Sequence, residues 1–72
     1  MERKREHLAQ VDRHIAECKA HIVRQREIIQ YAVEQGQPAE LAEGMLRAME
    51  ESLRAFERHR QVMLERLKTA SR

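Results

Sequence analysis

Apolar residues recur along this chain at alternating steps of three and four, the heptad spacing of helices that pack along a seam. Two such runs occur, separated by residues 35–38. The seam positions of the first run are Leu8, Val11, Ile15, Cys18, Ile22, Gln25, Ile29 and Ala32. Those of the second run are Ala42, Leu46, Met49, Leu53, Phe56, Arg60, Met63, Leu67 and Ala70. The pattern predicts two long helices, each with one polar residue in its seam.

The one strong break between the runs holds a glycine and a proline, Gly36 and Pro38. Glycine suits the left-handed residue that follows a helix, and proline suits the first position of the next helix. The sequence therefore predicts a single domain, residues 1–72, with a helix over about 3–35, a turn at 36–37 and a second helix over about 38–70. The expected fold class is all-α, an antiparallel helical hairpin.

Folding the second run back on the first gives facing positions whose residue numbers have a nearly constant sum. In this register Ile22 faces Leu53 across the seam. On one flank of the seam the register also pairs opposite charges, Arg26 with Glu50 and Lys19 with Glu57. Each such exposed pair contributes only about 0.2 to 1 kcal/mol, but both favour the same register.

The other flank of the seam widens the apolar stripe near the turn, where Ile28 faces Met45. A two-helix hairpin of 72 residues cannot cover such a stripe by itself, so we expect two copies to form a four-helix bundle. A higher oligomer, or another helical protein on the stripe, remains an alternative. The residues expected on the core and dimer face are Ile15, Ile22, Ile28, Ile29, Met45, Leu46, Met49, Leu53 and Phe56.

The charge distribution predicts how the two copies are arranged. Residues 1–13 and 54–72 share the open end of the hairpin and hold ten basic and five acidic side chains, a net charge of +5. Residues 14–53 hold four basic and seven acidic side chains, a net charge of −3. A head-to-tail pair places each basic open end against the acidic turn end of the other copy. We therefore expect an antiparallel homodimer.

Three residues of the first helix that can bind a metal share one face: His14, Cys18 and His21. The register places His59 opposite His14. Imidazole and thiolate groups at helical spacing can bind Zn, Ni or Cu, but no CxxC motif accompanies them, and the register directs Glu17 outward. The favoured interpretation is therefore structural packing, with no cofactor, and the four residues are kept as candidate ligands. Four histidines near one seam also suggest a pH-responsive interface.

The basic second helix supplies candidate nucleic-acid contacts, namely Arg54, Arg58, Arg66 and Lys68. Acidic residues interleave with them, and Tyr31 and Phe56 are the only aromatic residues other than histidine, so a solvated, salt-bridged face is the favoured interpretation. The sequence has no nucleophile motif, glycine-rich phosphate loop or HExxH motif, and we expect no enzyme.

The sequence also indicates the cellular compartment of the protein. The longest apolar run, residues 28–33, is far shorter than the roughly 20 residues that a membrane span needs. The single Cys18 cannot form an internal disulfide, which favours a reducing compartment. We expect a cytoplasmic protein with no membrane contact.

Residues 5–17, REHLAQVDRHIAE, continued by residues 22–29, IVRQREII, resemble the first helix of a group of small bacterial helical-hairpin proteins. The resemblance implies a glycine-containing turn and a second helix, and it carries over no activity. In architecture the hairpin is similar to Rop, a dimeric four-helix bundle that binds paired RNA loops, but no RNA-contacting residue of Rop can be matched here. The favoured function is a structural or adaptor module that binds proteins. The alternatives are a Rop-like nucleic-acid regulator that uses the basic open ends, and a metal-binding bundle.

Overall fold

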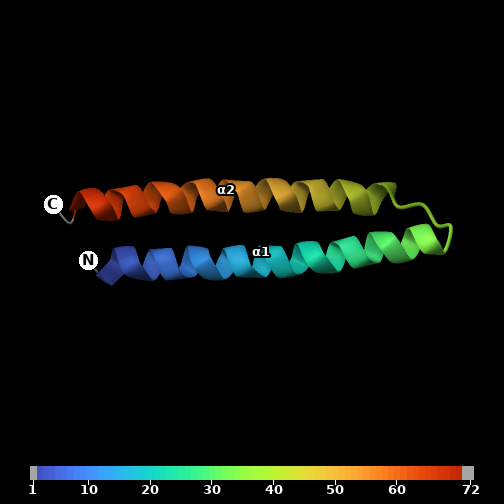
Figure 1. Ribbon diagram of the computed structural model, residues 1–72, viewed down its shortest axis with the longest axis horizontal. Helices are drawn as coiled ribbons and strands as arrows, with labels where there is room; N and C mark the ends of the chain where they lie inside the picture. Colours follow the sequence, from blue (N-terminus) through green and yellow to red (C-terminus); the bar gives the residue numbers. More distant parts are fainter. Residues whose placement is uncertain (1, 71–72) are drawn as a thin grey trace.

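Two long helices make up nearly all of residues 2–70, the part of the chain that the computed structural model describes. Helix α1 spans Glu2–Glu34 and helix α2 spans Glu40–Ala70. The helices lie side by side and antiparallel, with the connection at one end and the start of α1 beside the end of α2 at the other (Figure 1). The hairpin measures 58 × 15 × 12 Å. The predicted all-α antiparallel hairpin is confirmed.

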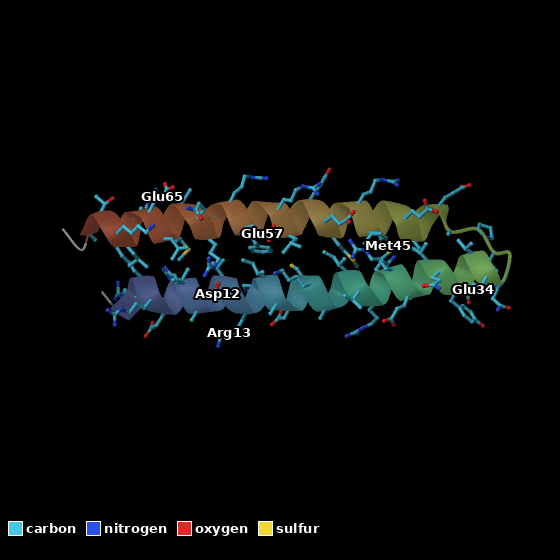
Figure 2. All side chains as sticks on the ribbon, in the orientation of Figure 1. Asp12, Arg13, Glu34, Met45, Glu57 and Glu65 are labelled. Atoms are coloured by element: carbon cyan, nitrogen blue, oxygen red, sulfur yellow. The ribbon has the colours of Figure 1, made fainter. Side chains whose placement is uncertain are left out.

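The helices pack along the seam that the heptad pattern predicts. Between residues 3 and 34, every residue that is buried or half-buried is one of the eight predicted seam positions. In α2 the predicted positions are half-buried up to Leu67, and Ala70 at the helix end is exposed. Side chains from both helices fill the space between the ribbons, whereas Arg13 points away from α2 (Figure 2). Within the described residues of α1 and α2, the buried side chains thus lie in this seam.

Both polar residues of the seam find a partner on the opposite helix. Gln25 is only 6% exposed, and its Nε2 donates a hydrogen bond to the carbonyl oxygen of Ala42 at 2.9 Å. The Nε of Arg60 donates to Oδ1 of Asp12 in an ion pair. A polar group buried without a partner is costly, so the hydrogen bond lets Gln25 stay buried in the seam. The side chain of Arg60 is 40% exposed, and its ion pair holds it to the opposite helix. A polar seam residue with one matching partner also fixes the register of a helix pair.

The connection between the helices is a Schellman turn. Gly36 has a φ of 67°, the N–H of Gln37 donates to the carbonyl of Ala32 at 2.8 Å, and the N–H of Gly36 donates to that of Val33 at 3.1 Å. These two bonds satisfy carbonyl groups that the end of α1 would otherwise leave free. The prediction of a left-handed glycine after the first helix is confirmed.

The predicted start of the second helix, at about residue 38, is wrong by two residues, because α2 begins at Glu40. The carbonyl of Ala39 accepts the first helical hydrogen bond, from the N–H of Glu43 at 2.8 Å, so Ala39 is the N-cap and Pro38 precedes it. Gln37 still belongs to the Schellman turn, because its N–H donates to Ala32. Pro38 and Ala39 then carry the chain from this turn to the start of α2. Ala39 is buried and anchors this crossing.

Replacing Gly36 by alanine tests the turn. We expect the G36A variant to lose about 1 kcal/mol of unfolding free energy, because a residue with a Cβ is strained in the left-handed region. No atom outside residues 35–37 lies within 4 Å of the added Cβ, so the loss comes from local backbone strain and not from a clash with the rest of the hairpin. Urea unfolding followed by circular dichroism, at one protein concentration, measures it.

The G44A variant is the matched control. Gly44 lies inside α2, and a Cβ there meets only the Arg47 guanidinium, at an ordinary 3.8 Å. Alanine at this position should stabilise the hairpin by up to about 1 kcal/mol, because it is the better helix former. Stabilisation by both substitutions would contradict the left-handed turn.

Candidate interaction face

The hairpin exposes more surface than a typical protein of its size. Its accessible area is 5992 Å², about 1,300 Å² above the roughly 4,700 Å² expected for a folded monomer of 8.6 kDa. Among the described residues only four apolar side chains are buried, and none of them fully: Val11, Ile15, Ile22 and Ala39. A typical protein interface covers about 800 Å² on each partner, so the excess is large enough for one.

One flank of the seam, here called the ionic flank, is closed by charges. It carries Asp12, Lys19 and Arg26 on α1, with Glu50 and Glu57 on α2. Nη2 of Arg26 lies 3.2 Å from Oε2 of Glu50, which confirms that predicted pair. The Asp12–Arg60 ion pair bridges the helices on the same flank.

The second pair that the register places together on the ionic flank lies together without an ion pair. Lys19 and Glu57 line one shallow groove, but they form no ion pair. Both side chains are exposed, and an exposed pair gains too little to offset the entropy of holding two long side chains together.

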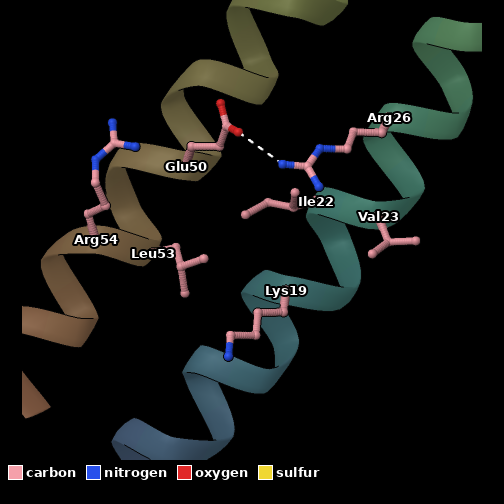
Figure 3. Close-up of a pocket in the computed structure, with 7 residues that line it drawn as sticks. All are labelled: Lys19, Ile22, Val23, Arg26, Glu50, Leu53 and Arg54. Atoms are coloured by element: carbon pink, nitrogen blue, oxygen red, sulfur yellow. Dashed lines mark hydrogen bonds and ion pairs between the residues drawn. The ribbon is translucent and has the colours of Figure 1, made fainter.

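A groove of about 300 Å³ lies in the middle of the ionic flank (Figure 3). Ile22 and Leu53 point into the space between the helices, and the Arg26–Glu50 pair crosses beside them (Figure 3). Lys19, Val23 and Arg54 complete the lining. The Arg26–Glu50 ion pair therefore connects α1 to α2 across this groove.

The opposite flank, here called the apolar flank, carries large apolar side chains that the hairpin leaves exposed. Near the turn these are Ile28 and Tyr31 on α1, with Leu41 and Met45 on α2, between 49% and 82% exposed. The spacings of three and four residues place each pair on one side of its helix. Within residues 3–70, no side-chain hydrogen bond or ion pair joins the helices on this flank. The apolar flank is therefore an exposed apolar surface without polar bridges among the described residues.

The predicted core and dimer face divides between the seam and this flank. Ile15 and Ile22 are buried in the seam. Half-buried in the seam are Ile29, Leu46, Met49, Leu53 and Phe56. Ile28 and Met45 alone are exposed, at 52% and 49%, and so remain available to a partner. Tyr31 and Leu41 were not predicted to join them, although their helical spacing from Ile28 and Met45 signals it.

The candidate metal ligands do not form a site within one chain. Cys18 is half-buried in the seam, whereas His14, His21 and His59 are exposed. Among the described residues, no three histidine, cysteine or acidic side chains converge on a point that could hold a metal ion.

His14 has two neighbours. Its ring stacks on that of Phe56, with centroids 5.6 Å apart and planes 11° apart. Its Nδ1 lies 4.0 Å from Oε2 of Glu17. The register directed Glu17 toward the outer face, but its carboxylate approaches this histidine, because residues three apart on a helix are neighbours.

The candidate nucleic-acid contacts are spread along α2. Arg54 lines the groove in the middle of the ionic flank, whereas Arg66 lines grooves near the open end together with Lys4. Arg58 and Lys68 are exposed. In the part of the chain that the structure describes, none of these four side chains forms an ion pair or hydrogen bond.

Comparison with known proteins gives no family for this chain. No protein-family model, no curated protein and no solved structure matches it. The resemblances to small bacterial hairpin proteins and to Rop therefore stay predictions. Neither α1 nor α2, over the described residues, is both long enough and apolar enough to cross a membrane.

Proposed function

We propose that this chain is a self-associating interaction module, in which two copies pack through the apolar flank into a four-helix bundle. The supporting observation is the difference between the flanks. Two ion pairs bridge the helices on the ionic flank, whereas the apolar flank exposes Ile28, Tyr31, Leu41 and Met45. Among residues 3–70, no side-chain hydrogen bond or ion pair joins the helices on the apolar flank. The proposal gives the chain a structural or adaptor role and no catalytic one.

A second copy is the partner that the charges favour. The open end, residues 1–13 and 54–72, has a net charge of +5, and the remainder has −3. Grooves at the open end combine apolar walls, such as Val62 and Met63, with the cationic side chains of Lys4 and Arg66. In a head-to-tail pair these grooves receive the partner's turn end, which offers apolar and acidic side chains together.

Charge substitutions on the two flanks test the dimer. Wild-type protein should have a solution mass near twice 8.6 kDa by light scattering. I28E and M45E should each weaken the dimer at least about tenfold, because each buries a carboxylate among apolar side chains.

V23E is the matched control, since Val23 is 54% exposed on the opposite side of the hairpin. It should leave the dimer intact. Circular dichroism checks that all three variants stay helical. A monomeric wild type, or equal weakening by V23E and I28E, would contradict the proposed face.

The salt dependence of dimerisation tests the orientation of the copies. In the head-to-tail pair opposite charges attract, so raising the salt from 0.05 to 0.5 M should weaken the dimer. A parallel pair stacks like charges and should strengthen instead. Sedimentation across the salt series separates the two, and strengthening would overturn the head-to-tail arrangement.

Nucleic-acid binding is the second candidate function, favoured by the unpaired Arg54, Arg58, Arg66 and Lys68. A regulator of this kind should bind an RNA hairpin at low salt and release it steeply as salt rises, because phosphate contacts release counterions. Filter binding with RNA and DNA hairpins measures this, with R58E as the test variant and R24E, an exposed position of α1 outside the open end, as the control. No retention at 0.05 M salt would exclude this candidate.

A further inference from the structure

Three imidazoles lie along the middle of the apolar flank. His14, His21 and His59 are all exposed and make no hydrogen bond through their side chains. Residues 3–70 of one chain do not gather three such side chains at one point. A metal site on this flank therefore needs a side chain from a second copy.

The position of these histidines along the hairpin indicates which side chain a second copy would supply as the missing ligand. Helix α1 runs from Glu2 to Glu34, so its midpoint is residue 18. His14 lies four residues before this midpoint and His21 lies three residues after it. In a head-to-tail pair that overlaps fully, a two-fold axis at the midpoint brings His14 within about one residue, or about 1.5 Å along the axis, of the partner's His21.

His59 belongs to the same layer as His14. The heptad register, in which Arg26 faces Glu50 as observed, places His59 opposite His14 on the apolar flank of α2. The ring that His14 contacts across the seam, Phe56, lies about one helical turn from His59. The layer therefore collects two imidazoles from one copy and one from its partner. Since the two-fold axis repeats every contact, the dimer contains two such layers.

We propose that the dimer binds two zinc-type divalent ions, each held by His14 and His59 of one copy and by the partner's His21. This inference rests on the proposed self-association. Three imidazoles and one open position are a common zinc coordination set, and neutral imidazole is a ligand that such ions prefer. Each ion would join the two copies, so metal binding and dimerisation reinforce one another.

Two contacts of His14 suit it to this role. Its ring stacks on Phe56, which limits its rotation. Glu17 lies 4.0 Å from Nδ1, so a small movement of its side chain would let Nδ1–H donate to the carboxylate and leave Nε2 for the ion. Cys18 takes no part, because its thiol lies in the seam.

The test uses the untagged full chain, stripped with EDTA and titrated with ZnCl₂ by calorimetry and sedimentation. We expect one Zn²⁺ per chain and a dimer dissociation constant at least tenfold lower with Zn²⁺. The H21A variant should lose both effects and still dimerise in EDTA. The H7A variant, altered nearer the open end of the same flank, should behave as wild type.

Mixing variants tests whether the site spans two copies. Neither the H14A/H59A double variant nor H21A should bind Zn²⁺ alone. Their mixed dimer contains one complete site, with His14 and His59 from the H21A chain and His21 from the other, so mixing should restore one ion per mixed dimer. A site within one chain cannot be restored in this way.

The outcomes separate this inference from the proposed function. A dimer in EDTA that binds no Zn²⁺ overturns the metal site and leaves self-association standing. A monomer under every condition overturns both. Zn²⁺ bound by H21A, or bound by wild type without any gain in dimer stability, overturns the site shared between copies.

Discussion

The packing of α1 against α2 along one heptad seam is the constraint on which the other features of this hairpin depend. Within the described residues no other element packs against either helix, and the seam holds only three buried apolar side chains, Val11, Ile15 and Ile22. Each layer therefore contributes a small, partly hydrated contact. Gln25 and Arg60 add hydrogen bonds that keep the layers in register, and the register decides which side chains line each flank.

The packing of each helix against a single partner also determines how much of this structure the sequence predicts. Because each helix has a single packing partner, the heptad spacing suffices to predict the seam of α1 in full. The start of α2 at Glu40 was not predicted, because the preference of proline for a first helical position says nothing about the residues needed to cross between axes. Lys19 and Glu57 face each other in the register, but an exposed pair has too little energy to fix its geometry.

The heptad register also predicts only part of the apolar flank. The register predicted that Ile28 and Met45 share a flank, but it did not extend the cluster to Tyr31 and Leu41, which lie further from the seam. The Asp12–Arg60 pair was missed for a related reason, since the long side chain of Arg60 reaches about one turn beyond the residue that it faces. The contacts of a long side chain that reaches beyond the residue it faces depend on its length and on nearby partners. A periodic pattern does not encode either.

The bonds between α1 and α2 also bear on the order in which the contacts of one chain form during folding. Gln25 and Ala42 are 17 residues apart, Arg26 and Glu50 are 24 apart, and Asp12 and Arg60 are 48 apart. The entropy lost in closing a loop grows with its length, so the contacts next to Gly36 are the least costly to form first. We therefore expect the cross-helix contacts to form from the turn outward and to open first at the open end. We also expect the amide hydrogens of the helical turns around Gln25 to exchange most slowly.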